Sequence, residues 1–167
     1  MATIASLKRI SPQKLAELLL AASASPKLAV VDVRDDGDKS PLALSCAFQP
    51  TKLRTDVRLC TCYADYIGGH IRGAHHFPSS SLDATWPTLL RRLQDADTVV
   101  FHCALSQQRG PGAALRYLRE QGQTGGVPGQ TIYVLDRGFT GWQEVYGDDE
   151  RLTEGFRKEL WRELSWS

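Results

Sequence analysis

Three short apolar segments constrain the fold of this 167-residue chain more than any other feature. They span residues 27–34, 97–103 and 130–136. Runs this short and this continuously apolar are typical of strands that are buried on both faces of a sheet. Helical patterns separate the three runs. Strands that alternate with helices predict an α/β fold, with a central, mostly parallel sheet flanked by helices on both faces.

The helical segments carry recognisable start signals. The segment "SPQKLAELLLAA", residues 11–22, offers Ser11 as the N-cap, Pro12 at the first helical position, and leucines at helical spacing. Two further helices are expected over 81–94 and 110–121, and a short strand within 73–79.

The end of the chain has a stripe of apolar residues four apart: Leu152, Phe156, Leu160 and Leu164. This spacing predicts a C-terminal helix over about 150–165 that packs its apolar face on the core. The length is that of one domain. We therefore expect residues 1–167 to form a single domain.

Composition excludes several classes of protein. The chain is 42% hydrophobic and 23% charged with a formal charge of +1, which gives no sign of a nucleic-acid or membrane partner. The segment "MATIASLKRISPQK" lacks the apolar core of a secretory signal, and no apolar run is long enough to span a bilayer. Four cysteines without such a signal do not indicate a disulfide scaffold. We expect a soluble cytoplasmic protein, with the nucleus as an alternative location.

The segment "VVFHCALSQQRGPGAAL", residues 99–115, carries the chemistry. Cys103 ends a predicted buried strand and Arg109 stands where the next helix starts. Ligands of parallel sheets bind beyond the carboxyl ends of the strands, so Cys103 lies at the expected edge. The helix dipole, the Arg109 fork and inward-turned loop amides would all favour a thiolate and hold a tetrahedral oxyanion. The expected amide donors are those of Ala104, Leu105, Ser106, Gln107 and Gln108.

Taken alone, Cys103 would be interpreted as a buried structural cysteine, since cysteine is among the most buried residue types. The combination HCxxxxxR, placed at a strand end, a loop and a helix start, favours a nucleophile that attacks a bound oxyanion. We assign His102 a supporting role in the geometry of the loop.

The stretch "HCALSQQR" resembles the signature loop of cysteine-dependent phosphatases of the rhodanese fold. The type is that of the M-phase inducer phosphatases and the related eukaryotic arsenate reductases. The stretches "VVDVRDD", "DYIGGHIRGAHHFP" and "VLDRGFTGW" resemble recurring blocks of that fold, in the family's order. The resemblance covers most of the chain from Ser11 to Trp142.

The resemblance implies roles for individual residues. Cys103 would attack phosphorus or arsenic, and the amides of 104–108 together with Arg109 would hold the three equatorial oxygens. The Ser106 hydroxyl would donate a hydrogen bond to the sulfur. Neither a metal nor a cofactor is implied. The matching framework positions are expected to be structural: Asp32, Arg34, His70, Gly73, Gly138, Phe139 and Trp142.

The chain departs from the family pattern at two places. The loop contains no acidic residue where the M-phase inducer enzymes have them, so the general acid for the leaving group is unassigned, or comes from the substrate or from another loop. Val33 stands where those enzymes carry a second cysteine, so the corresponding disulfide cannot form.

Residues 37–64 interrupt a family block as an atypical insertion that holds Cys46, Cys60 and Cys62. Three interpretations stay open: a zinc site, thiols that resolve an adduct on Cys103, or a retained intron. The CxC spacing argues against structural zinc. Otherwise we expect a loop on the ligand side of the sheet.

Three functions follow from one cysteine loop. The first is a protein tyrosine or dual-specificity phosphatase that acts on a phosphorylated protein through a cysteinyl-phosphate. The second is an arsenate reductase that uses glutathione and glutaredoxin as electron donor. The third is a sulfurtransferase or a non-catalytic binding module. The loop is one residue longer than in most rhodanese sulfurtransferases, which favours an oxyanion substrate.

Overall fold

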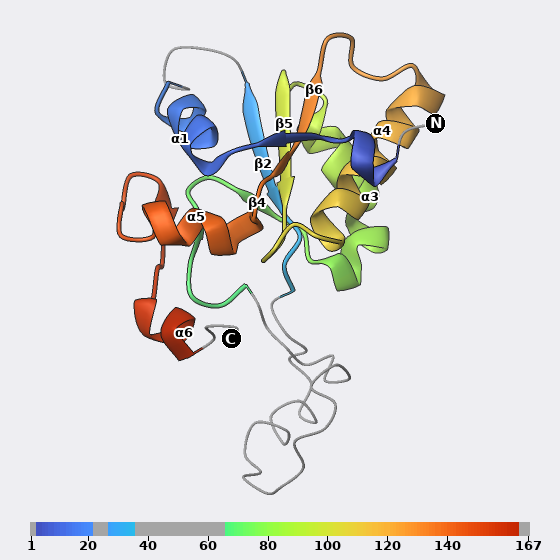
Figure 1. Ribbon diagram of the computed structural model, residues 1–167. Helices are drawn as coiled ribbons and strands as arrows, with labels where there is room; N and C mark the ends of the chain where they lie inside the picture. The colour runs from blue at the N-terminus through green and yellow to red at the C-terminus, as the bar shows by residue number, and fades with distance from the viewer. Residues whose placement is uncertain (1–2, 22–26, 36–65, 164–167) are drawn as a thin grey trace, which may run out of the picture.

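A five-stranded parallel sheet forms the centre of the molecule, with strand order β1-β6-β5-β2-β4 (Figure 1). The computed structural model describes residues 3–21, 27–35 and 66–163. The three apolar runs form the three central strands, as predicted. The strands of this sheet are β1 (Lys8–Ile10), β2 (Leu28–Asp32), β4 (His75–His76), β5 (Thr98–His102) and β6 (Thr131–Leu135).

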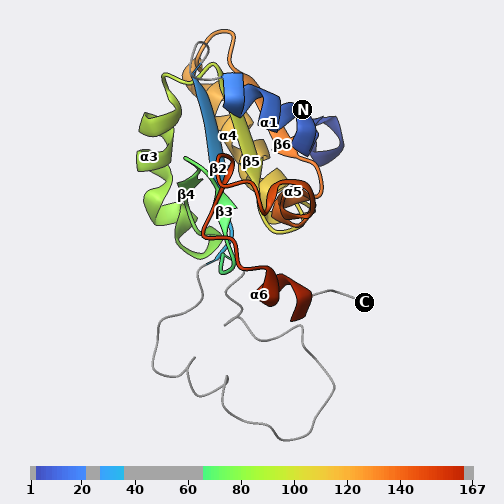
Figure 2. The same ribbon diagram turned by 90° about the vertical axis from the view of Figure 1, so that its left-hand side faces the viewer.

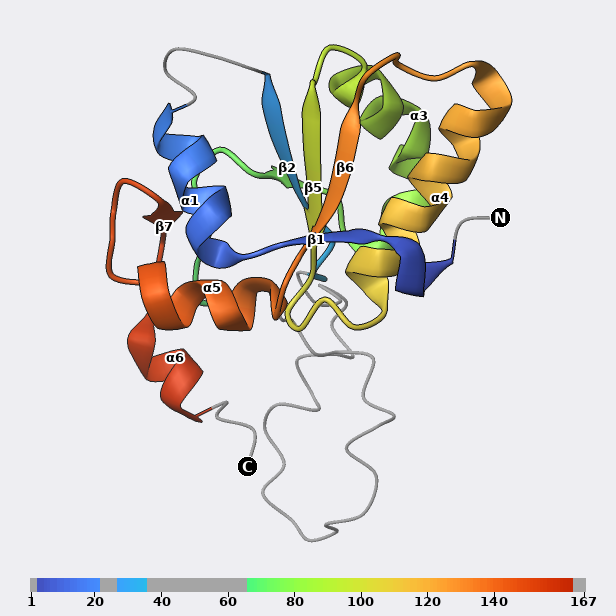
Figure 3. The same ribbon diagram turned by 45° about the horizontal axis from the view of Figure 1, so that its top comes forward.

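Helices cover both faces of the sheet. Figures 1 and 3 show α1 and α5 on one face and α3 and α4 on the other. The predicted fold class and its layers are thereby confirmed. The helices are α1 (Pro12–Ala21), α3 (Leu82–Leu93), α4 (Arg109–Thr124), α5 (Gly138–Tyr146) and α6 (Lys158–Glu163), with 3-10 turns η1 (Ile4–Ser6) and η2 (Ser79–Ser81).

The alternation of side chains along β5 explains why its three central residues, Val99 to Phe101, are all apolar. Val99 and Phe101 pack into the core under α3 and α4, with Trp86 and Tyr117. Val100 packs into the other core, which includes Trp142 of α5. Since successive strand residues point to opposite faces, a strand covered on both sides must be apolar throughout.

The expected N-cap of the first helix is present. Ser11 Oγ accepts a hydrogen bond from the Lys14 backbone N–H at 3.2 Å, and Pro12 occupies the first helical position. This satisfies one of the amides that a helix start leaves without a partner.

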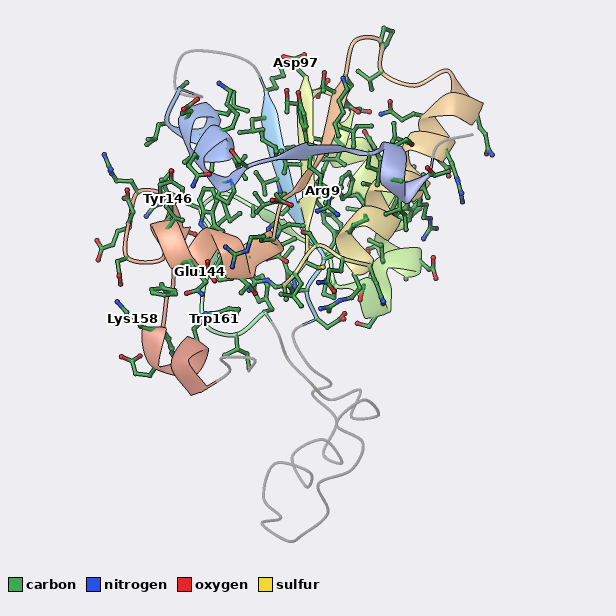
Figure 4. The ribbon with its side chains drawn as sticks, viewed as in Figure 1. Arg9, Asp97, Glu144, Tyr146, Lys158 and Trp161 are labelled. Atoms are coloured by element: carbon green, nitrogen blue, oxygen red, sulfur yellow. The ribbon has the colours of Figure 1, made fainter. Side chains whose placement is uncertain are left out.

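The C-terminal helix predicted over 150–165 is wrong in its first half. β7 (Thr153–Glu154) pairs antiparallel with β3 (His70–Ile71), and Gly155 adopts a left-handed φ of 64°, so a helix cannot start before this point. Only α6 is helical. Figure 2 shows α6 near the end of the described chain, and its Trp161, labelled in Figure 4, packs against the core. The indole N–H of Trp161 also donates to the Gly68 carbonyl at 2.8 Å.

Besides the β3–β7 pair and the 3-10 turns, two elements of the fold were not predicted. β1 is a three-residue edge strand paired with β6, and only Ile10 in it is buried. α5 follows β6 directly, with Gly138 at its start. Within the described part of the chain, no helix is long and apolar enough to cross a membrane.

The predictions for the insertion at 37–64 fall outside the described residues. So do Cys46, Cys60 and Cys62, and these predictions stay open. In the ranges that the structure describes, no cluster of three or more potential metal ligands occurs.

Candidate active site

Cys103 is the first residue beyond β5, the middle strand of the sheet. Its side chain is buried at 3% exposure. The helix α4 begins six residues later and passes close to the strand end. A Cβ on Gly110 would lie only 3.2 Å from the Cys103 nitrogen and from His102 Cα. The glycine therefore lets the helix N-terminus approach the thiol, where its dipole favours negative charge.

The start of α5 fixes the loop that carries Cys103. The N–H of Phe139 donates to the Cys103 carbonyl and that of Thr140 donates to the Ala104 carbonyl, both at 2.9 Å. From the edge strand β1, Arg9 Nη2 donates to the Ser106 carbonyl at 3.3 Å (Figure 4). Because these three bonds hold loop carbonyls toward the rest of the protein, the loop amides can point toward a bound anion.

The loop reverses its direction at Ser106. This serine is buried and adopts a left-handed φ of 50°. Its backbone N–H donates to Cys103 Sγ at 3.2 Å. Its hydroxyl oxygen accepts a bond from the Cys103 N–H at 3.4 Å. The predicted contact of the hydroxyl with sulfur is therefore replaced by a backbone contact, which stabilises negative charge on the sulfur in the same way.

A buried polar layer lies directly beneath the loop. His102 is fully buried, with Nδ1 3.3 Å from the Cys103 carbonyl and Nε2 3.7 Å from Asp32 Oδ2. Asp32 in turn receives Arg34 Nη2 at 2.6 Å and Nε at 2.9 Å. His102 thus connects the loop to a buried ion pair, in keeping with the supporting role expected for it.

The buried Asp32 stays ionised. Burial raises the pKa of its carboxyl group, but the charges of His102 and Arg34 and the hydrogen bonds from Arg34 outweigh burial and hold the pKa below its usual value. The Arg34 guanidinium is enclosed as well. It lies 4.0 Å from the centre of the Phe139 ring, and it donates to the Gly69 carbonyl at 2.8 Å. The framework role predicted for Asp32 and Arg34 fits this arrangement.

Arg109 occupies the first position of α4, as predicted. Its Nη1 donates to Asp35 Oδ2 at 2.9 Å. Asp35 directly follows the segment "VVDVR", within which β2 ends, and it was not predicted as a site residue. The sequence signal that could have identified Asp35 is an acidic residue just beyond a strand end. Within the run "RDDGD", however, Asp35 resembles one of several solvated charges.

Gly138 has a larger role than the packing role expected from sequence. Its φ is 57°, and a Cβ there would lie 2.4 Å from the Cys103 carbonyl oxygen and 2.5 Å from that of Ala104. The first turn of α5 can reach the loop carbonyls only because this residue has no side chain.

The structure thus places the predicted loop residues together at the carboxyl edge of the sheet, between the starts of α4 and α5. The contact of the Ser106 amide with sulfur is present. Leu105, Gln107 and Gln108 lie at the exposed surface of the loop. The roles assigned to Cys103, to Arg109 and to the remaining amides stay predictions.

The chain is similar to known proteins in both sequence and structure. The sequence model of the rhodanese-like domain matches residues 15–145. The chain is 44% identical over 110 residues to the CDC25-like phosphatase YCH1 of Saccharomyces cerevisiae, which covers 59% of this chain and 73% of the relative. It is 37% identical over 139 residues to arsenate reductase 2.1 of Oryza sativa subsp. japonica, which covers 81% of this chain and 69% of the relative.

A solved structure of a yeast protein tyrosine phosphatase of the rhodanese family superposes with a TM-score of 0.67 at 32% identity. The match covers 97% of this chain and all of that one (100%). This chain therefore belongs to the rhodanese-like domain family. Its relatives include phosphatases and arsenate reductases, so the family expected from the signature loop is confirmed.

Proposed function

We propose that this protein is a cysteine-dependent phosphatase of the protein tyrosine or dual-specificity type. The observation that carries the proposal is the loop of five residues between Cys103 and Arg109. α5 holds two of its carbonyls while the Ser106 amide contacts Sγ at 3.2 Å. A loop of this form is suited both to stabilise a thiolate and to bind the dianion that the thiolate attacks.

The reaction proceeds in two displacements. Cys103 Sγ attacks phosphorus, the ester P–O bond breaks with its electron pair passing to the leaving oxygen, and a cysteinyl-phosphate forms. Water then attacks phosphorus, the P–S bond breaks, and phosphate and thiolate are released. Loop amides and Arg109 hold the equatorial oxygens through both steps. No metal or cofactor enters this proposal.

The proton for the leaving group does not come from Asp35. Burial raises the pKa of this carboxyl group, but hydrogen bonds from Ser79, Ser80 and Arg109 outweigh burial and keep the pKa below its usual value. An ionised carboxylate cannot donate a proton. We assign that proton to water or to the substrate.

Arsenate reduction is the second candidate, and the loop without an acid favours it, since reduction needs no alkoxide to be protonated. Sγ attacks arsenic and water leaves. A glutathione thiolate then attacks the Cys103 sulfur and the S–As bond breaks toward arsenic. Arsenic gains two electrons as arsenite, and the two thiols are oxidised to a mixed disulfide that glutaredoxin reduces.

A paired assay on the purified protein and on Cys103→Ser tests both candidates. One arm follows hydrolysis of p-nitrophenyl phosphate, and the other follows NADPH-coupled arsenate reduction with glutathione and glutaredoxin. We expect hydrolysis that falls at least about 10³-fold in the variant, because serine at this site lacks a competent nucleophile. Turnover of arsenate without hydrolysis would assign the protein to reduction. If the parent protein is inactive in both assays, both candidate functions are contradicted.

The natural substrate we propose is a phosphorylated protein, or a small oxyanion with glutaredoxin as partner if reduction is the activity. The location that we propose is the cytoplasm, with the nucleus as the alternative.

Arg9→Met is expected to lower kcat/KM for p-nitrophenyl phosphate by about threefold to tenfold. The change removes the charged donor to the Ser106 carbonyl, and charge-assisted bonds of exposed groups contribute modestly. Steady-state kinetics measure the effect. Lys8→Met, on the same strand and exposed, is the matched control. Equal kinetics for the two variants would show that Arg9 does not support the loop.

A further inference from the structure

The carboxylate of Asp35 joins three segments that are far apart in the sequence. Oδ2 accepts a hydrogen bond from Arg109 Nη1 at 2.9 Å, at the start of α4. The same oxygen accepts one from Ser79 Oγ at 2.7 Å. Oδ1 accepts one from the backbone N–H of Ser80 at 2.9 Å. The residue itself lies just beyond the end of β2.

These contacts fix the carboxylate in space. Two donors come from the 3-10 turn η2, which leads into α3, and they hold both oxygens. The backbone of Asp35 adds a further tie, because its carbonyl accepts a bond from the Tyr66 N–H at 3.1 Å. A carboxylate that is held at both oxygens and at its backbone can orient a flexible arginine side chain. Without such a partner, the arginine would lose its rotamer freedom only when the ligand binds.

Arg109 needs such orientation. Its side chain is 36% exposed, whereas that of the buried Arg34 is not exposed at all. A partly exposed arginine at a helix start samples several rotamers unless a partner selects one. The 2.9 Å contact with Asp35 supplies that partner from a neighbour that is itself held in place. Binding affinity gains from preorganisation of this kind, because the ordering cost is met before the ligand arrives.

We propose that Asp35 is a positioning residue that preorganises Arg109 for the oxyanion, and this rests on the function proposed for the site. Asp35 orients the guanidinium from the side of β2 and η2, and the anion binds to an arginine that is already placed.

Two roles for Asp35 predict different kinetics. A general acid speeds departure of poor leaving groups far more than of good ones, since good ones need no proton. A positioning residue alters the binding of the phosphoryl oxygens, which all esters share. The lowered pKa of Asp35, held down against burial by its hydrogen bonds, agrees with the second role.

Asp35→Asn is the decisive variant, since it keeps the shape of the side chain and removes its charge. We expect KM for p-nitrophenyl phosphate and for phenyl phosphate to rise by the same factor of about ten, the loss of one charge-assisted bond at a part-buried site. The concentration of inorganic phosphate that protects Cys103 from iodoacetate should rise by the same factor. Asp35→Glu should restore part of both losses.

Asp83→Asn is the matched control, because Asp83 is an exposed acid in the first turn of α3 that pairs with Arg116. It should leave both constants unchanged. Thermal unfolding of each variant verifies that the fold persists. If Asp35→Asn does not fold, Asp35→Glu is measured alone, with an intermediate rise expected.

Unchanged KM and unchanged phosphate protection in Asp35→Asn would overturn the proposal. So would a much larger loss with phenyl phosphate than with p-nitrophenyl phosphate, which would make Asp35 the missing acid. Failure of the proposed function is separate and visible in the parent protein. In that case the parent protein would not hydrolyse the esters, and phosphate would not protect its Cys103 from iodoacetate.

Discussion

Asp32→Asn is expected to lower the free energy of unfolding by about 3–5 kcal/mol, the cost of leaving a buried charge without its partner. Asp32 and Arg34 are both fully buried, and Arg34 Nη2 lies 2.6 Å from Asp32 Oδ2. In the variant, the guanidinium keeps the Gly69 carbonyl and the Phe139 ring as contacts but loses its counter-charge. A typical domain has only about 5–15 kcal/mol of stability to lose.

Urea unfolding followed by circular dichroism measures this difference. The matched control is Asp149→Asn, which makes the same chemical change in a pair with Arg151 at 2.8 Å, where the arginine side chain is 74% exposed and that of the aspartate 25%. Solvent screens that pair, so the control should unfold close to the parent midpoint. Similar losses in the two variants would mean that burial of the Asp32–Arg34 pair has no special cost.

The same pair predicts how stability depends on pH. Because the folded-state pKa of Asp32 lies below its usual value of 3.8, the stabilisation is fully present above that value. It is lost as pH falls through the lowered folded-state pKa, since the unfolded chain then binds the proton first. Stability of Asp32→Asn should therefore change less than that of the parent protein below about pH 4.

The position of the active-site loop could be predicted because it depends on a local signal. A continuous apolar run places β5 in the centre of the sheet, and Pro111 marks the start of the next helix. A cysteine between those two signals must lie at the carboxyl edge. The geometry that orients Arg109 was not predictable in this way. Asp35 lies 74 residues from Arg109 in sequence, and only tertiary packing brings them together.

Each element that was not predicted escaped prediction for its own physical reason. β1 is short and one-sided, so three residues carry no periodicity, and pairing with β6 determines its structure. α5 begins with "GFTG", where glycine opposes helix propensity. The tail reads as a helix by spacing alone, but antiparallel pairing with β3 holds residues 153–154 as a strand. For β1 and for the tail, a strand partner remote in sequence overrides the local preference.

Gly138→Ala is expected to lower kcat/KM for p-nitrophenyl phosphate by about 10²–10³-fold, the range seen when one donor to a developing oxyanion is lost. The added Cβ would lie 2.4 Å and 2.5 Å from the carbonyl oxygens of Cys103 and Ala104. Both neighbours are backbone atoms, so the clash is relieved only if the loop and α5 move apart. That motion breaks the bonds from the amides of Phe139 and Thr140.

Gly129→Ala separates this effect from backbone strain. Gly129 has a similar left-handed φ of 83°, but a Cβ there would meet nothing within 4 Å. Both alanine variants bear a cost of about 1–2 kcal/mol for the left-handed conformation, so both should unfold at lower temperature. Only Gly138→Ala should lose activity and lose protection of Cys103 by phosphate. Full activity in Gly138→Ala would mean that the loop holds its shape without α5. An equal loss of activity in both variants would trace the effect to stability alone.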